Sequence, residues 1–543
     1  MRSWTARGQL ALLSIVACAV ALAGCGSDQD TAATQAARAF AASMAKQDTD
    51  GTAALTTSPS QAAESLGATF ASMHAKTVST SISDTVEYSD GTASFRLTST
   101  WKWSDDRSFE AKTTGNVRKL STGWKVQWDP GLLYAGLPIG GNLQMIRTDA
   151  TPAPIVRSTS GKPFMQMVPV YQININPAAT RNLQRSVKLL AASIKPIAPL
   201  VTAKVINDKL VAAQGQEVTA VALRAEDMKV LASDPARIAG VTVLKSGMLV
   251  MTDRRMSTPL ASGLTNYWQA IRDATAGWQV QMVGPGIAPR ELAGEQGGPG
   301  PDVRTSVNQG EQLTLGDAVV EVAQPATIMT LDAASGGILA MAQNPAAAQN
   351  QTSGDVAYPV GNTLDPVFSA VDGASKGDEK AANDMLNDFG LGVTFTVPGV
   401  SMPRSPSVSV STAAFNPKNF TASMLNMGAL GVALARSVGG AGQSVAPFVI
   451  KGAPSKVSGG ELGKMDPAVA RQITAAMAKI AKSGDASDLT GAPGLRALVG
   501  TNGPQGPGWF VGLQGGKVVV VYCEGDKSGT AALQVAQKYF RIK

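Results

Sequence analysis

Apolar and polar residues alternate along two segments in the first quarter of the chain. Residues 92–103 (Thr-Ala-Ser-Phe-Arg-Leu-Thr-Ser-Thr-Trp-Lys-Trp) and 124–128 (Trp-Lys-Val-Gln-Trp) both show this pattern. Because successive side chains of a strand point to opposite faces, both segments are predicted to be antiparallel strands with one buried face. Apolar residues at helical spacing predict helices over residues 31–46 and 60–76. The first domain is therefore expected to pack helices on a curved sheet and to end near Pro130.

The middle of the chain mixes helical and strand patterns. Helices are expected over residues 178–197 and 222–232, and strands over residues 240–244 and 278–282. The stretch that follows, 284–312, is rich in glycine and proline, a composition typical of a linker. The sequence therefore predicts a second α+β unit that ends before this stretch.

The last part of the chain predicts a sheet sandwiched by helices. Asp466 is a helix cap with Pro467 in the first turn, and Val469, Ile473 and Met477 then fall on one face. Another helix, over residues 530–539, closes the chain. The strands are expected to form two hairpins, 326–332 with 338–341 and 509–513 with 517–522.

The N-terminus carries the pattern of an exported lipoprotein. After two arginines, an apolar run from Leu10 to Leu22 continues into Ala-Gly-Cys25, the box that a lipoprotein signal peptidase recognises. The run is shorter than the ~20 residues that span a bilayer. We expect a signal peptide over residues 1–24, lipid on Cys25 and a polar tether over residues 25–31, which anchor the protein to the extracytoplasmic face of the bacterial cell membrane. The alternative is an ordinary secretory signal in which Cys25 is incidental.

The amino-acid composition argues against several classes of site and ligand. Cys18 leaves with the signal and Cys25 carries lipid, so Cys523 is left alone and no intrachain disulfide is expected. His74 is the sole histidine, which argues against a Ser-His-Asp triad and a histidine-rich metal site. The glycine-rich stretches lack a phosphate-binding pattern, and no cofactor is expected. The net charge of +7 is too weak to indicate nucleic acid, but it leaves weak attraction to anionic wall polymers or lipids open.

Three segments of the chain resemble motifs that occur in the same order in class B penicillin-binding proteins with an NTF2-like N-terminal domain. Residues 124–133 match the Trp-x-Val-x-Trp-x-Pro end of that domain, residues 326–345 the first transpeptidase hairpin, and residues 509–512 (Trp-Phe-Val-Gly) the strand after the third catalytic motif. The resemblance implies an α+β multidomain protein. Its expected parts are an NTF2-like domain (32–131), a middle non-catalytic α+β domain similar to the family's dimerisation domain (132–286), a linker (287–312) and a C-terminal serine β-lactamase or transpeptidase-like domain (313–543).

Active members of this family use three motifs, Ser-x-x-Lys, Ser-x-Asn and Lys-Thr-Gly. The serine attacks the D-alanyl-D-alanine carbonyl, and the lysine one helical turn later lowers the cost of deprotonating it. Ser-x-Asn relays protons and holds substrate. Lys-Thr-Gly lies on an edge strand that pairs with the peptide and binds its carboxylate.

The resemblance places the first motif at a segment that has lost its chemistry. Asn362 stands at the nucleophile and Asp365 at the lysine. An amide is not a useful nucleophile, and a carboxylate reverses the charge that the lysine supplies. The neighbouring hydroxyl of Thr363 would point about 100° around a helix from the pocket, so rescue by Thr363 is not expected.

The other two motifs are also missing. The second should lie between Gly373 and Gly392, where no Ser-x-Asn occurs, and Ser423-Met-Leu-Asn426 has the wrong spacing. The third should precede Trp509, where the chain reads Ala497-Leu498-Val499-Gly500-Thr501. Gly500 and the threonine survive, and Leu498 or Val499 stands in place of the lysine.

Several look-alikes occur elsewhere. Residues 527–530 (Lys-Ser-Gly-Thr) follow the last strands and are expected to open the final helix. Ser43-Met-Ala-Lys46 and Ser99-Thr-Trp-Lys102 lie in the first domain, and the second of these is in a predicted strand, where positions i and i+3 face opposite sides. We interpret all three as chance matches to short patterns.

The preferred hypothesis is a non-catalytic penicillin-binding-protein-like lipoprotein of peptidoglycan synthesis. Its expected partners are the membrane, through the lipid anchor, and peptidoglycan or wall-synthesis proteins, with no nucleic acid. The alternative is an active penicillin-binding D,D-transpeptidase or carboxypeptidase that acts on peptidoglycan stem peptides through displaced residues. In a third hypothesis, the first two domains bind a ligand in an NTF2-like cavity and the last domain is structural.

Overall fold

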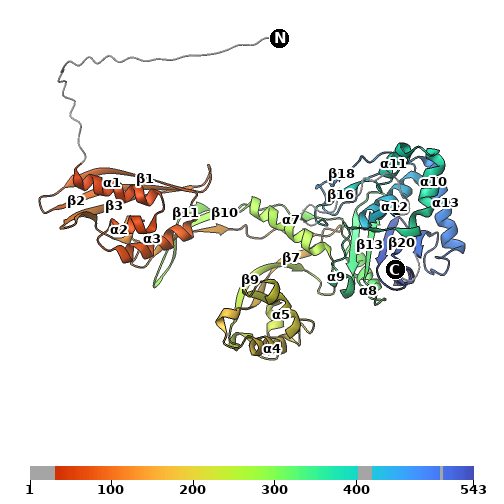
Figure 1. The fold of residues 1–543 in the computed structure, drawn as a ribbon, viewed down its shortest axis with the longest axis horizontal. Coiled ribbons are helices and arrows are strands. Elements are labelled where there is room, and N and C mark those ends of the chain that lie inside the picture. The colour runs from red at the N-terminus through yellow and green to blue at the C-terminus, as the bar shows by residue number, and fades with distance from the viewer. Residues whose placement is uncertain (1–30, 402–418, 502–505, 543) are drawn as a thin grey trace, which may run out of the picture. The chain divides into compact units, whose positions relative to one another are not determined.

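The computed structural model describes residues 31–401, 419–501 and 506–542. The expected signal peptide, Cys25 and all but the last residue of the expected tether therefore lie outside the described residues. The chain divides into two compact units, which are described separately: residues up to Thr148 with Trp278–Gln296, and Asp149–Gly277 with Gly297 onwards (Figure 1). None of the described helices is both long enough and apolar enough to cross a membrane.

The first unit packs three helices and two sheets around one apolar core. Its helices are α1 (Ala32–Ala45), α2 (Thr49–Ala54) and α3 (Pro59–Met73), and a short 3-10 turn, η1, spans Pro130–Leu132. The four-stranded sheet has the order β1 (Thr77–Glu87), β2 (Thr92–Lys102), β3 (Ser108–Leu120) and β4 (Gly123–Val126). The three-stranded sheet has the order β11 (Ile287–Glu295), β10 (Gly277–Gly284) and β5 (Asn142–Thr148).

Local sequence patterns explain most elements of this unit. In β2 every second side chain is buried, including Phe95, Leu97 and Trp101. Helix α1 begins after Thr31, whose hydroxyl accepts a hydrogen bond from the Thr34 amide at 3.2 Å. The helix expected over residues 60–76 is shorter: α3 ends at Met73, and His74 follows it with a left-handed φ of 47°.

All three strands of the second sheet come from segments that the sequence assigned elsewhere, and β5 lies in the segment expected to be the middle domain. β10 contains the predicted strand 278–282, which we placed in the middle domain, and β11 lies in the stretch expected to be a linker. In the structure these strands pair with each other, and Gly286 takes a φ of 73° in the turn between them. The apolar face of β10, with Trp278, Val280 and Met282, joins the core of the first unit. The chain returns to the first unit because this apolar face is buried in that unit's core.

The second unit begins with a sheet of order β12-β6-β7-β8, with β9 paired to the other edge of β7. Its elements are β6 (Val156–Arg157), β7 (Pro163–Ile175), η2 (Pro177–Ala179), α4 (Leu183–Ile194), α5 (Ala203–Ala212), β8 (Val218–Arg224), α6 (Ala225–Met228), η3 (Pro235–Arg237), β9 (Val241–Met251), α7 (Leu260–Ala274) and β12 (Val303–Arg304). Residues 170–245, which we call the lobe, have an apolar core of their own that includes Ile173, Leu190 and Leu210.

The helix expected over residues 222–232 is wrong. The segment begins inside β8, which pairs with β7 from Val218 to Arg224, and only the four residues of α6 are helical. Alanine favours helix, but the preference is small per residue, and pairing with a long neighbouring strand outweighs it.

The rest of the second unit is built on a five-stranded antiparallel sheet of order β14-β13-β21-β20-β19. Its strands are β13 (Ala326–Asp332), β14 (Ile338–Gln343), β19 (Arg496–Thr501), β20 (Gly508–Gln514) and β21 (Lys517–Cys523). Helices α8 (Gln309–Val319) and α14 (Ser528–Ile542) pack on one face, and α10 (Asp365–Ser375), α12 (Met424–Val438) and α13 (Pro467–Ser483) contribute to the core on the other. The remaining elements are α9 (Pro345–Gln349), β15 (Ala357–Pro359), η4 (Gly361–Leu364), α11 (Glu379–Asp388), β16 (Thr394–Thr396), β17 (Thr421–Ser423) and β18 (Lys456–Ser458).

The sequence predicted the plan of this sheet correctly. Both expected hairpins, β13–β14 and β20–β21, are present with antiparallel pairing. Helix α13 begins as predicted, because the Asp466 carboxylate accepts hydrogen bonds from the amides of Ala468 at 2.6 Å and Val469 at 3.4 Å. The sheet is sandwiched by helices (Figure 1).

Candidate functional site

The segment predicted to hold the first motif lies in the turn η4 and the first turn of α10. Asn362 is in η4 and Asp365 is the first residue of α10, and both side chains are exposed. Pro366 follows Asp365, and because proline has no amide hydrogen it is tolerated in a first helical turn. An acidic side chain at this position complements the positive end of the helix dipole. Asp365 therefore suits the start of a helix rather than the activation of a nucleophile.

Thr363, between these two residues, is buried, with 1% of its surface exposed. Its hydroxyl donates a hydrogen bond to the Val360 carbonyl oxygen at 2.6 Å. This bond closes the turn that leads into α10. The hydroxyl is therefore part of the backbone architecture, in line with the expectation that Thr363 does not replace the serine.

Aromatic side chains of the central sheet hold this turn in place. The indole nitrogen of Trp509, on β20, donates to the Pro359 carbonyl oxygen at 2.9 Å. Tyr358 stacks on Tyr522 of β21 at a ring distance of 4.3 Å, and Trp509 lies 4.4 Å from the same ring. Burial raises the pKa of Tyr522 well above its usual value. Its phenol therefore stays protonated at neutral pH and contributes packing rather than proton transfer.

The segment predicted to hold the third motif lies on β19, the edge strand of the sheet, against which η4 packs. Strand alternation separates the two candidates for the lysine position. Leu498 is fully buried in the core shared with α10, α12 and α13, whereas Val499 packs in the core on the α14 face. Gly500 pairs with Trp509 in the strand register and, two residues after Leu498, belongs to the same face. Leu498 is thus the residue on the face toward the first motif.

The structure therefore brings the predicted first and third motif positions together. Asn362 and Asp365 stand beside a strand whose central side chain on that face is the apolar Leu498. An anionic substrate would meet a carboxylate and no motif cation at these positions. Thr501 ends the described part of β19, and residues 502–505 lie outside the described residues.

The region expected to hold the second motif contains the end of α10 and helix α11. Its sole serine, Ser375, is buried, and its hydroxyl donates to the Asp372 carbonyl oxygen at 3.3 Å. The rejected candidate Ser423-Met-Leu-Asn426 has a different role, because it caps α12. The Ser423 hydroxyl donates to the Asn426 side-chain oxygen at 2.6 Å, and the Asn426 amide donates back to that hydroxyl at 3.1 Å. Both residues are buried in this reciprocal cap.

The look-alike motifs fall where the sequence placed them. Ser528 is the first residue of α14, and its buried hydroxyl donates to the Gly506 carbonyl oxygen. Ser99 and Lys102 lie on β2, where the serine is buried and the lysine is exposed. Ser43 is on α1, and its hydroxyl accepts a hydrogen bond from Thr52 at 2.9 Å. The hydroxyls of Ser43 and Ser528 therefore form hydrogen bonds with Thr52 and Gly506 rather than with the lysines of these short patterns.

The free thiol and the acidic side chains offer little further chemistry. Cys523 is buried in β21, and burial raises the pKa of its thiol above the usual value. The thiol therefore stays protonated and is a poor nucleophile. In the part of the chain that the structure describes, no group of three or more His, Cys, Asp and Glu side chains could hold a metal ion.

One buried polar cluster was not foreseen from the sequence. Glu311 on α8 is buried, forms an ion pair with Lys517 of β21, and accepts a hydrogen bond from the Tyr539 hydroxyl at 2.6 Å. Burial and the Glu311 carboxylate raise the pKa of Tyr539 above its usual value. The cluster ties α8, β21 and α14 together on the face opposite the degenerate motifs. We interpret it as structural because each charge has a partner.

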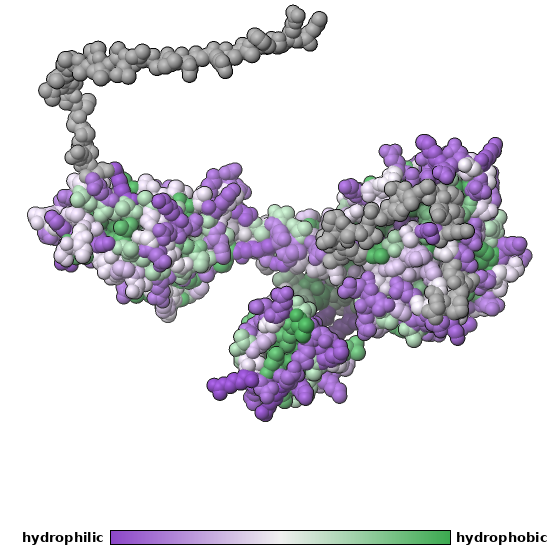
Figure 2. Space-filling model, in the orientation of Figure 1, coloured by the Kyte–Doolittle hydropathy of each residue, from purple (hydrophilic) through white to green (hydrophobic). Residues whose placement is uncertain are grey.

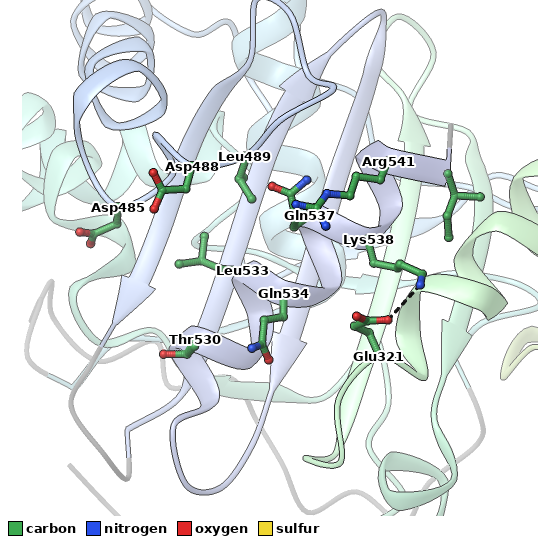
Figure 3. Close-up of a pocket in the computed structure, with 11 residues that line it drawn as sticks. Glu321, Asp485, Asp488, Leu489, Thr530, Leu533, Gln534, Gln537, Lys538 and Arg541 are labelled. Carbon is green, nitrogen blue, oxygen red and sulfur yellow. Dashed lines mark ion pairs between the residues drawn. The ribbon is translucent and has the colours of Figure 1, made fainter.

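Two hollows lie away from these motif positions. A groove of about 510 Å³ runs beside α14, with Asp485 and Asp488 toward one end and the Lys538–Glu321 ion pair, at 3.1 Å, toward the other (Figure 3). The groove lies on the face of the five-stranded sheet that α14 covers. In the first unit, a hollow of about 450 Å³ is bordered by Asn116 of β3 and by residues 127–132, within the segment of the Trp-x-Val-x-Trp-x-Pro motif.

Comparison with known proteins identifies part of the first unit. A family described as the NTF2-like N-terminal transpeptidase domain matches residues 32–140. The match covers α1 to β4 and the Trp124–Leu133 motif. No curated protein sequence matches the chain. The chain therefore has an NTF2-like N-terminal domain of the kind that accompanies transpeptidases, within a mixed α+β structure.

Proposed function

We propose that the chain is a non-catalytic, penicillin-binding-protein-like lipoprotein of peptidoglycan synthesis, which binds or organises parts of that machinery. The observation that carries the proposal is the packing of η4 against β19. Asn362 and Asp365 are exposed at the positions of the serine and lysine, beside a strand whose lysine position is the buried Leu498. The nucleophile and both motif cations are replaced, whereas the surrounding helices and strands remain.

The proposed arrangement has three parts. The NTF2-like domain is followed by a middle non-catalytic α+β domain and by a C-terminal domain of the serine β-lactamase or transpeptidase type. The antiparallel sheet of order β14-β13-β21-β20-β19, with helices on both faces, supports the last assignment. Lipid on Cys25 would hold all three at the extracytoplasmic face of the membrane, and peptidoglycan or other wall-synthesis proteins are the proposed partners.

The hydroxyls nearest the degenerate motifs support a non-catalytic role. Thr363 and Ser423 are buried, and their hydroxyls donate to the Val360 carbonyl oxygen and to the Asn426 side-chain oxygen, neither of which is a base that would activate a nucleophile. The negative charge of Asp365 also supports a non-catalytic role, because it would repel the carboxylate of a stem peptide or a penicillin. A protein built in this way can keep a recognition surface after its chemistry is lost, since function resides in sites carried on folds.

Turnover of a stem-peptide mimic that ends in D-alanyl-D-alanine tests the proposal. The wild-type chain is expected to release no D-alanine above the rate in buffer. Release that Thr363→Val or Ser423→Ala abolishes, and that the matched control Ser369→Ala on the exposed side of α10 leaves unchanged, would establish the active alternative. Ser369 is a suitable control because it lies on the same helix as the motif but is exposed.

A further inference from the structure

The lobe of the second unit concentrates positive charge on one helix pair. Residues 181–205, which span α4 and the start of α5, contain five basic and no acidic residues, in a chain with 47 basic and 40 acidic residues overall. All five cations are exposed: Arg181, Arg185, Lys188, Lys195 and Lys204. Lys204 is bridged at 2.8 Å by Asp208, which lies beyond this stretch. Such a concentration is not explained by the modest net charge of the chain.

Large apolar side chains are exposed within the same stretch. Leu200 is 81% exposed, Leu189 is 47% exposed and Val205 is 37% exposed. Figure 2 shows apolar surface on this lobe, bordered by hydrophilic side chains. The neighbouring residues Val187 and Ile206 are buried in the lobe's core, so the exposed residues are not part of the packing that holds α4 and α5 in place.

The exposed apolar residues lie at the end of the helix pair where the chain connects α4 to α5. The two helices pack against each other and are joined by residues 195–202, which include Leu200. Leu189 lies less than two turns before the end of α4, and Val205 is in the first turn of α5. Lys188, Lys195 and Lys204 lie on this part of the helix pair, whereas Arg181 and Arg185 lie where α4 begins. The surface formed by Leu189, Leu200, Val205 and these three lysines we call the basic apolar tip.

We propose that the basic apolar tip binds the surface of an anionic lipid bilayer. Cations near such a surface are attracted to lipid phosphates, and exposed leucine and valine side chains can enter the boundary between headgroups and acyl chains. This contact is separate from the lipid on Cys25 and does not depend on the proposed function of the C-terminal sheet. It would give the protein a second point of contact with the membrane.

Two other occupants fit the surface less well. A second copy of the chain in a two-fold interface would bring the lysines of one tip against those of the other, which is unfavourable. A soluble anionic polymer would satisfy the cations, but it would leave Leu200 in water. A bilayer surface accounts for both the charge and the apolar side chains.

Hydrogen exchange of the full chain tests this proposal. Exchange of backbone amides in residues 195–205 is measured with vesicles of phosphatidylglycerol and with vesicles of phosphatidylcholine. We expect the anionic vesicles to slow exchange by about ten-fold or more relative to neutral ones, because each cation near an anionic surface contributes a factor of about five. Raised salt should weaken this protection, since it screens the attraction.

Leu200→Ser should lower the protection by about ten-fold, because it removes the most exposed apolar side chain of the tip. Lys195→Gln should lower it by about five-fold. The matched control is Val211→Ser: Val211 is 78% exposed but lies at the far end of α5, so its replacement should leave the protection unchanged.

Four results would overturn the proposal. The first is equal protection by neutral and anionic vesicles, and the second is no protection by either. The third is protection by soluble poly(glycerol phosphate) that matches the vesicles and is insensitive to Leu200→Ser, which would assign the tip to a soluble polyanion. The fourth is a dimer, seen by sedimentation without lipid, that Leu200→Ser dissociates, which would assign the tip to a second copy.

Discussion

Asn426 provides a sharp test of whether the Ser423-x-x-Asn426 segment is architectural. Its side chain makes four hydrogen bonds in a site that is almost fully buried. The oxygen accepts from the Ser423 amide at 3.0 Å and the Ser423 hydroxyl at 2.6 Å. The nitrogen donates to the carbonyl oxygens of Gly390 at 2.6 Å and Val393 at 2.8 Å. Asn426 thereby joins the start of α12 to the segment after α11.

Asn426→Ala removes all of these bonds and leaves the partner atoms buried. A hydrogen bond contributes about 1 kcal/mol net, and a buried group left without a partner costs somewhat more. Four lost bonds therefore suggest about 4 kcal/mol. The higher helix propensity of alanine offsets roughly 0.7 kcal/mol of this loss. We expect the second unit to be destabilised by about 3 kcal/mol.

Calorimetric unfolding of the full chain measures this effect. A unit of this size loses about 2 °C of Tm per kcal/mol, so the transition of the second unit should fall by about 6 °C. The control is Asn350→Ala, because Asn350 is exposed and its side chain donates to Glu524 at 3.4 Å. That replacement should change stability by less than about 0.5 kcal/mol. A shift of less than about 2 °C for Asn426→Ala would refute the structural role argued for this residue.

Trp509→Phe should destabilise the second unit by about 2 kcal/mol, because it removes the 2.9 Å hydrogen bond to Pro359 and leaves a smaller ring in the core. Calorimetry should show this loss of stability as a lower Tm, and hydrogen exchange should show faster exchange of the amides in η4. Burial opposes ionisation of Asp302, but a backbone amide and the Arg157 guanidinium outweigh it and hold the pKa of this carboxyl below the usual 3.8. Its stabilisation, at most about 1 kcal/mol after screening, should be complete above pH 3.8 and be lost as the pH falls below it, so the Tm difference between wild type and Asp302→Asn should shrink in acid. Cys25→Ala should release the protein from membranes or leave the precursor uncleaved; a processed, membrane-bound variant would contradict the lipobox interpretation.

Much of the fold was predictable because a helix or strand with one buried face has a regular pattern of apolar residues in the sequence. Strand β2 shows the alternation that buries Phe95 and Leu97, and α13 shows the cap at Asp466 followed by one apolar face. Both patterns depend on neighbours in sequence. β5 and β10 were both assigned to the middle domain, because local periodicity predicts a strand but does not identify the core against which its apolar face packs.

The candidate site was predictable in position but not in detail. Family motifs placed the third motif at Leu498 or Val499, and the strand register then showed that Leu498 is on the face toward α10. The cap formed by Ser423 and Asn426 was visible in the sequence as a serine with an amide three residues later, but the pair was considered only as a catalytic motif. The basic apolar tip required the structure, because exposure of Leu200 depends on how α4 and α5 pack.

Acylation by penicillin tests the central claim most directly. Purified wild-type protein and the Asn362→Ser variant are each incubated with excess penicillin, and their intact masses are measured. We predict no added mass for either, because Asp365 and Leu498 supply no cation to activate a serine or attract the drug. A stable adduct on the wild-type chain, mapped to any residue of the C-terminal domain, would contradict the non-catalytic role and establish the active alternative.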